Sequence, residues 1–236
     1  MKVCVAMSKC VVFSFAVLFS LSIQAQSYVV DEGEGSDQGG GKRSDYNLYS
    51  LSKANGLTLI SQVELSDGGL LLACHVKGQT HLAGFLLESR GPQDLVLARL
   101  DAEGELIWFH QIGGAVKQEL TWIQVHEDGS FSIAGQFEGR MQGPWEDFQS
   151  AGQNDVFLAH FNLEGGLDWA QQFTSRHSLA VQSPVIEGGS MEISLEVTKM
   201  KRHALLHLWV PTVINYEHFR FNADGELQER FNSEQP

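Results

Sequence analysis

Two histidines separated by four positions are the first candidates for chemistry in this sequence. His203 and His207 enclose the segment HALLH, and two histidines at this spacing bind zinc when they lie on one face of a helix. The glutamate that serves as the base in the metalloprotease form of this motif is absent. On a β-strand, which rises about 3.3 Å per residue, the two imidazoles would lie about 13 Å apart. We therefore predict no metal site here, and packing or surface roles for both histidines.

Acidic side chains gather in two short segments, DAEGE (101–105) and NADGE (222–226). A calcium loop of the EF-hand type distributes its ligands over about 12 residues and ends with a bidentate glutamate. Both segments are much shorter than such a loop, and both fall at one position of the repeat described below. They are therefore predicted to form turns rather than metal sites.

Cys74 is the candidate nucleophile. A nucleophilic thiol needs a histidine as its base, and the neighbouring His75 points to the opposite face if the segment is a strand. Cys74 is therefore predicted to be a buried, unreactive side chain. The sequence also lacks a GxSxG motif, a phosphate-binding loop and a pair of cysteines with metal-ligand spacing. It thus predicts no cofactor and identifies no catalytic residue.

The best candidates for ligand binding are Trp145, Glu146 and Asp147. They lie in GRMQGPWEDFQS (139–150), between predicted strands, and the repeat has Gly84 where this copy has the tryptophan. Binding residues are concentrated on loops that a rigid scaffold positions. By contrast, Trp108 and Trp169 recur at one repeat position, so they are predicted to belong to the core.

A repeat defines the elements that must position these residues. Shifting the chain by 61 residues gives 14 identities over residues 65–112 without a gap, whereas ordinary residue usage would give about 3. The clearest match places QDLVLARLDAEGELIWFHQI (93–112) on NDVFLAHFNLEGGLDWAQQF (154–173). A fainter copy, FNADGEL (221–227), follows with Glu229 in place of the tryptophan, and DYNLYSLSKANGL (45–57) matches 94–106 as a half copy.

Two turns punctuate each unit. One turn has Asp101, Asn162 or Asn222 first and glycine fourth, which predicts a type I turn followed by a left-handed glycine and a bulge. The other is SDGG, EDGS or EGGS, with a hairpin glycine. We expect Gly165 to be sensitive to substitution, and Gly152 to lie in a less constrained loop.

The segments between the turns are predicted to be strands. In DVFLAHF (155–161) the alternating side chains are partly apolar on both faces, which is typical of a strand packed on two sides. In LDWAQQF (167–173) we expect Leu167, Trp169, Gln171 and Phe173 to share one face. The clearest unit then has four strands, roughly 122–126, 130–137, 155–161 and 167–173, and this is the composition of a β-propeller blade.

The predicted fold class is therefore all-β, with antiparallel four-stranded repeats that form a partial or open β-propeller arc. The run DGSFSIAGQFEG (128–139) followed by 150–173 resembles the repeats of exported bacterial proteins named for seven-bladed β-propellers. The resemblance covers residues 45–231 and implies the fold and an extracytoplasmic setting, but no catalytic residue. The domain divides into a half unit at 45–60 and units at 61–121, 122–181 and 182–231.

Three and a half units are fewer than the four or more blades of a closed propeller. The unpaired flanks of such an arc favour a covering partner. Self-association of two arcs is one possibility, and an open arc bound to a different partner is the other.

Residues 1–25 have the order of a secretory signal peptide, with Lys2 and Lys9, an apolar run at 11–23 and Ala25 at the cleavage point. That run is shorter than the ~20 residues of a membrane-spanning helix. A glycine- and acid-rich leader (26–44) precedes the repeat domain, and a tail (232–236) follows it. We therefore expect a secreted, periplasmic or cell-surface protein with no membrane span in its mature form.

The formal net charge of −13 becomes more negative when Lys2 and Lys9 are removed. This acidity disfavours nucleic acids and anionic membrane surfaces as partners. Cleavage also removes Cys4 and Cys10, so Cys74 has no partner for a disulfide and packing must stabilise the core.

These features favour a secreted, non-enzymatic β-propeller-like module for binding or assembly, with a protein or glycan partner. One alternative is a propeller-type enzyme acting on polysaccharide, with Asp147 as its acid or base. The other is a degenerate copy of a longer propeller protein. The repeated turn acids have a structural explanation and the remaining acids form no constellation, so the sequence favours the module over the enzyme.

The first prediction concerns export. The mature protein is expected to begin at or near Gln26, because the basic, apolar and small-residue regions of 1–25 follow one another in the required order. N-terminal sequencing of the protein from its native host tests this. Cytoplasmic protein that retains Met1 would contradict it.

Overall fold

The computed structural model describes residues 56–182, 184–187, 190–202 and 208–234. These residues form strands and turns with no helix among them, and so no apolar helix of membrane-spanning length occurs in this part of the chain. The predicted signal peptide, the leader and residues 45–55 of the half unit lie outside the described residues, as do His203 and His207.

The first two units form sheets of the same topology. The first sheet contains β1 (Leu57–Glu64), β2 (Leu70–Val76), β5 (Asp94–Leu100) and β6 (Leu106–Ile112), antiparallel and in chain order. The second contains β7 (Gln118–Val125), β8 (Phe131–Phe137), β11 (Asp155–Phe161) and β12 (Leu167–Phe173). A small hairpin lies between the middle strands of each sheet: β3 (Gln79–Leu82) with β4 (Phe85–Glu88), and β9 (Arg140–Met141) with β10 (Phe148–Gln149).

The third sheet keeps the four-stranded order but differs between its middle strands. It contains β13 (Ser178–Val181), β15 (Ser190–Arg202), β16 (Trp209–Phe221) and β17 (Leu227–Ser233), and β14 (Val185–Glu187) also pairs with β15. Here β15 and β16 continue past the sheet in place of a separate small hairpin. The predicted antiparallel four-stranded repeats are therefore confirmed, although each first strand begins a few residues before the predicted start of its unit.

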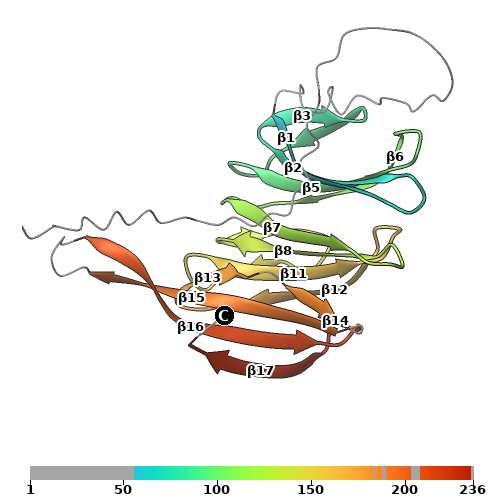
Figure 1. Ribbon diagram of the computed structural model, residues 1–236. Coiled ribbons are helices and arrows are strands. Elements are labelled where there is room, and N and C mark those ends of the chain that lie inside the picture. Colours follow the sequence, from blue (N-terminus) through green and yellow to red (C-terminus); the bar gives the residue numbers. More distant parts are fainter. Residues whose placement is uncertain (1–55, 183, 188–189, 203–207, 235–236) are drawn as a thin grey trace, which may run out of the picture. The chain divides into compact units, whose positions relative to one another are not determined.

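The second sheet packs on both of its faces, as the alternation in residues 155–161 predicts. Phe157 and Phe161 are fully buried in a core shared with the first sheet, whereas Val156 and Leu158 are buried in a core shared with the third. Figure 1 shows the three sheets following one another in this order. Because each such side chain contributes roughly 1.5–3 kcal/mol on burial, packing between sheets is a main source of stability.

An indole hydrogen bond joins each sheet to the next. Trp108 Nε1 donates to the carbonyl oxygen of Leu163 at 3.2 Å, and Trp169 Nε1 donates to that of Ala223 at 3.1 Å. Both acceptors are the second residue of the Asn-to-Gly turn in the following sheet. Both tryptophans pack against the core clusters, as predicted, but each is only partly buried. Glu229 replaces this donor in the third sheet.

The turns have the predicted geometry. Gly104, Gly165 and Gly225 have φ values of +88°, +82° and +76°, and Asn162 Oδ1 accepts a hydrogen bond from the Gly166 amide at 2.8 Å. A Cβ atom at Gly165 would also lie 2.7 Å from the Trp108 ring. The glycine therefore provides both the left-handed backbone and the space for the indole of the preceding sheet.

The bulge that accompanies this turn corrects one prediction. The strand register shifts between His160 and Phe161, which places Leu167 opposite Phe161. Leu167 consequently packs against the core of the first two sheets, while Trp169 faces the third. The expectation that the two share a face is wrong, because the extra residue of a bulge interrupts the alternation of side chains.

Gly152 is more constrained than the sequence indicates. A Cβ atom at this position would lie 2.3 Å from the carbonyl oxygen of Ser175. The same loop is held by the fully buried Asp155, whose carboxylate accepts hydrogen bonds from the amides of Ala151 at 2.5 Å and Ser175 at 2.9 Å. The expectation of a less constrained loop is therefore wrong.

The third sheet presents polar side chains on the face that points away from the second sheet. Arg220 forms ion pairs with Glu192 and Glu229, each at 2.9 Å, and His218 hydrogen-bonds to Ser194 and Ser233. Among the described strands, none of the first sheet pairs with one of the third, so the array is an open, β-propeller-like arc. One apolar side chain, Phe231, is also exposed on this face, where its ring stacks on that of His218.

The glycines provide the second prediction. Gly152→Ala, through collision with the Ser175 carbonyl, and Gly165→Val, through collision and left-handed backbone strain, are each expected to lower the free energy of unfolding by roughly 1–3 kcal/mol. Gly84→Ala is the control, because Gly84 has a φ of +85° but no atom near its Cβ position, and backbone strain alone costs roughly 1 kcal/mol. Urea denaturation measures all three. A Gly152→Ala variant as stable as the original protein would show that the Ser175 carbonyl moves aside.

Candidate functional site

The predicted ligand residues lie at the tip of the β9–β10 hairpin but do not converge. Trp145 packs onto the core, with its ring 5.3 Å from that of Phe148 and 6.1 Å from that of Phe157. Asp147 forms an ion pair with Arg140 across the hairpin, and Glu146 is exposed. None of the three predicted residues lines either of the two cavities considered below. Their role in ligand binding stays a prediction.

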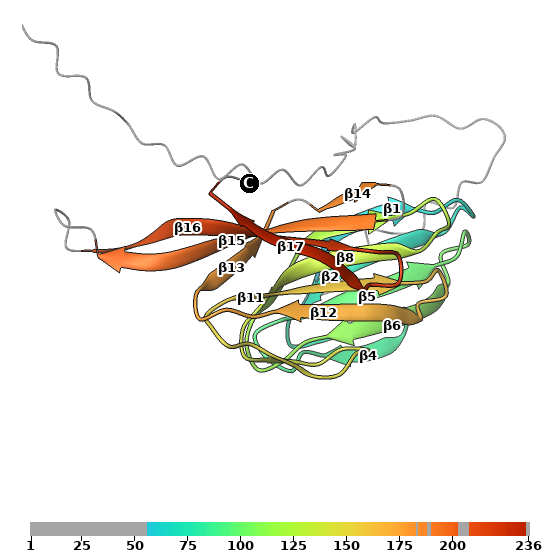
Figure 2. The ribbon, with the colours of Figure 1, turned by 90° about the horizontal axis from the view of Figure 1, so that it is seen from below.

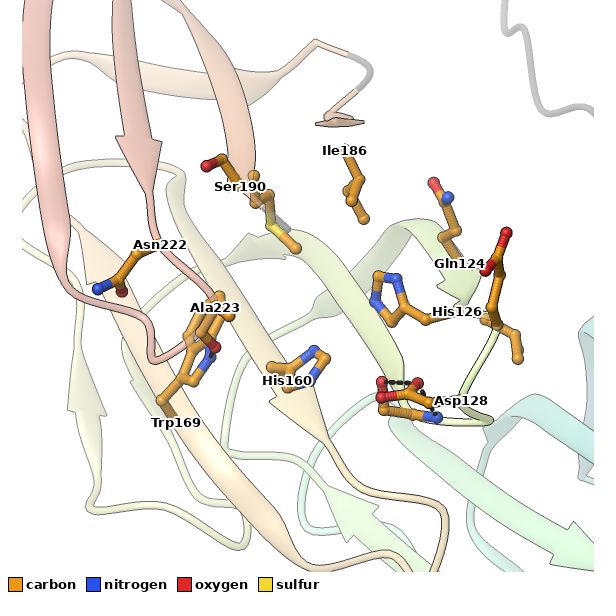
Figure 3. A pocket seen from close by; sticks show the side chains of 13 residues that line it. Gln124, His126, Asp128, His160, Trp169, Ile186, Ser190, Asn222 and Ala223 are labelled. Carbon is orange, nitrogen blue, oxygen red and sulfur yellow. Dashed lines mark hydrogen bonds between the residues drawn. The ribbon is translucent and has the colours of Figure 1, made fainter. Parts of the chain in front are cut away.

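A cavity of about 640 Å³ lies between the second and third sheets. Figure 3 shows side chains from both sheets pointing into it. Polar and apolar groups both line it: polar residues are more numerous, and one indole and a few aliphatic side chains provide apolar surface. The lining residues are Gln124, Val125, His126, Glu127, Asp128, Ser130, His160, Trp169, Ile186, Ser190, Met191, Asn222 and Ala223.

Two histidines in the wall of this cavity share one serine. Ser132 Oγ lies 2.9 Å from His126 Nε2 and 2.9 Å from His160 Nδ1, because His160 and Ser132 are opposite each other on β11 and β8. The other ring nitrogen of His160 lies 3.7 Å from a carboxylate oxygen of Asp168. One arrangement satisfies every group: His126 donates to Ser132, and Ser132 donates to His160.

The surroundings keep both imidazoles neutral. Burial lowers the pKa of His126, and the nearby His160 lowers it further while Asp128 opposes the shift. Burial also lowers the pKa of His160 against the opposing effect of Asp168. The pKa of Asp128 is lowered because the hydroxyl and amide of Ser130 donate to it. The cavity thus contains an ionised carboxylate beside two neutral rings at pH 7.

The cavity exists because the second interface between sheets has smaller side chains than the first. Ala223 occupies the turn position at which the preceding repeat has Leu163, a side chain that packs in the first interface. His160 likewise occupies the position of Arg99, which spans the first interface to bond the Leu163 carbonyl at 3.0 Å. Shorter side chains at both positions leave the second interface hollow.

This geometry does not provide a nucleophile. Ser132 has a histidine partner, but the serine is fully buried and a substrate could not reach its oxygen. Burial raises the pKa of the Cys74 thiol to about 11, and Cys74 lies in the core of the first sheet, as predicted. In the part of the chain that the structure describes, no three histidine, cysteine or acidic side chains are grouped as metal ligands would be.

Comparison with known proteins does not assign this chain to a family. Neither a protein-family model nor a curated protein matches this chain.

Sequence analysis overlooked the cavity residues, although a signal was present. His126 and Ser132 stand where the first repeat has Leu65 and Leu71, two side chains that are buried in the first core. Polar residues that replace core leucines in one copy of a repeat indicate that the apolar core is interrupted at that position.

The histidines provide the third prediction. Folding lowers the pKa of these histidines, so at acidic pH the unfolded chain binds a proton more readily than the folded chain does. Protonation therefore favours unfolding. Stability is therefore expected to fall as the pH decreases below about 6.5, the ordinary pKa of histidine. Urea denaturation at pH 7.5 and 5.5 measures this.

His126→Gln is expected to reduce the pH dependence, because one such histidine is removed while an amide can still donate to Ser132. The control is His177→Gln, a histidine in a loop outside this network. An equal pH dependence in the original protein and in His126→Gln would contradict the assignment.

Proposed function

We propose that this protein is an exported, non-enzymatic binding module with a β-propeller-like fold. Its ligand would enter the cavity between the second and third sheets. The cavity volume of about 640 Å³ lies within the range of about 300–1,000 Å³ that is usual for small-molecule sites. The single observation that carries the proposal is that Ala223 and His160 hollow out an interface that is packed in the preceding repeat.

The lining favours a neutral, polyhydroxylated ligand such as a glycan. Glu127 and Asp128 contribute acceptors, whereas no lysine or arginine is found among the described residues that line the cavity, so an anionic ligand would be repelled. Neutral His126, Asn222 and Ser190 can each donate or accept hydrogen bonds. Trp169 adds an aromatic wall, and apolar walls with a few placed polar groups are typical of ligand sites.

Binding is favoured over hydrolysis by the state of the carboxylates. A glycosidase needs one carboxyl group that stays protonated to act as the acid. Hydrogen bonds lower the pKa of Asp128, and Asp147, the acid considered in the enzyme alternative, is paired with Arg140. A degenerate copy of a longer propeller would have no reason to retain a bound ligand, so ligand binding also separates the module from that alternative.

The fourth prediction concerns ligand binding. Ala223→Leu should fill the cavity with the side chain that the preceding repeat has at this position. We expect a glycan identified on an array to lose at least about 30-fold in affinity, roughly 2 kcal/mol, in titration calorimetry. Ala102→Leu is the matched control, because Ala102 is exposed at the same turn position of the first unit.

Different results support different functions. Binding that survives Ala223→Leu would place the ligand elsewhere, with Trp145 as the next site to substitute. Release of the chromophore from synthetic glycosides would favour the enzyme. Failure to bind any glycan on the array would contradict the proposed function.

A further inference from the structure

The extended β15–β16 hairpin forms an arm beyond the third sheet, defined here as residues 199–202 and 208–214. Pairing of β13 with β15 ends at Thr198, and pairing of β17 with β16 ends at Tyr216. Beyond these points, within the described residues, β15 and β16 pair only with each other. Figures 1 and 2 show the two strands projecting past their neighbours.

The arm has one apolar face. Cross-strand partners lie on the same face of a β-ladder, and Met200 is opposite Pro211 while Arg202 is opposite Trp209. The exposed fractions are 41% for Met200, 65% for Trp209 and 60% for the adjoining Leu208. A tryptophan this exposed is unusual on a soluble surface, and contiguous exposed apolar groups mark interaction sites.

Both faces of the arm carry basic side chains. Lys199 and Lys201 lie on the face away from Met200, and Arg202 lies on the Met200 face opposite Trp209. Residues 199–202 and 208–214 contain no acid. Four residues past Thr198 extend the arm by roughly 13 Å, which exceeds the Debye length of about 8 Å at physiological ionic strength. The charge of −13 on the whole chain is therefore screened from the end of the arm.

A groove of about 440 Å³ at the base of the arm is also positively charged. Its charged side chains are Arg176 and Lys199, and no acid is present among the described residues that line it. Gln153 and Ser178 add neutral hydrogen-bond donors. An apolar face beside a cationic groove can bind a molecule with an acyl part and an anionic part.

Two arms from different copies of the chain would not pair well. Edge-to-edge pairing would bring Lys199, Lys201 and Arg202 of both copies together, and like charges opposite each other destabilise a sheet. Tryptophan and basic side chains on an apolar element are instead typical of segments that bind at the membrane interface. We propose that the arm docks on an anionic lipid bilayer, with Trp209 and Met200 at the acyl boundary and a headgroup phosphate in the groove.

The test compares variants of the full chain in flotation with vesicles of phosphatidylcholine alone or with 30% phosphatidylglycerol. Residues 1–30 are common to all variants, so differences between variants report the arm. Lys199→Gln/Lys201→Gln is expected to weaken binding to the anionic vesicles about 30-fold. Lys77→Gln/Lys117→Gln removes the same charge from exposed positions next to β2 and β7, and is expected to weaken binding less than about 3-fold.

Trp209 provides a second measurement. Anionic vesicles are expected to shift the tryptophan emission to shorter wavelength, and Trp209→Phe should abolish this shift while most of the binding remains. Equal effects of the two lysine pairs, or no shift that depends on Trp209, would overturn the proposal.

Two other partners, a free anion and a second copy of the chain, would give different results. Displacement of the protein from vesicles by millimolar inorganic phosphate would assign the groove to a free anion and overturn the membrane assignment. A dimer in light scattering that Trp209→Ala dissociates, without vesicle binding, would assign the arm to a second copy and would also overturn it. Because these tests do not involve the cavity at Ala223, their failure is distinguishable from failure of the proposed function.

Discussion

A tryptophan that packs against the turn of the next sheet, and donates a hydrogen bond to it, is the contact that recurs at both interfaces of the array. It fixes the position of one sheet on the next, since Trp108 and Trp169 reach the same turn carbonyl in successive units. The bond also explains why glycine is required at Gly165 and Gly225, where a Cβ atom would collide with the ring. The turn, the bulge and the interface therefore depend on one another, and they occur together in successive units.

Features within one unit could be predicted because they have local causes. Asn162 and Gly165 determine a turn through their own backbone preferences, and the alternation in β11 follows from burial of both faces. Prediction failed where a distant segment decides the outcome. The constraint on Gly152 comes from the Ser175 carbonyl, more than twenty residues away, and the orientation of Leu167 depends on a bulge that the hydrophobic pattern does not record.

The candidate cavity belongs to this second class. Its volume depends on how Ala223 in one sheet faces His160 in another, and that relation requires the register between sheets. The sequence nevertheless contained part of the answer, because a repeat provides its own reference for what packing requires. Comparing each unit with its neighbour position by position would have found His126 and Ser132, whereas a search for motifs could not. The loop residue Trp145, which that search selected, proves to be packed on the core.

The polar outer face of the third sheet has a consequence for how such a protein changes in evolution. A closed ring has a fixed circumference, so gaining or losing one blade strains every other. Among the described strands, Arg220, Glu192 and Glu229 make the outer face of the third sheet charged. A duplicated unit inserted between the first two sheets would meet the same two faces as its neighbours. Such an insertion would lengthen the array by a whole unit and leave the outer face of the third sheet unchanged.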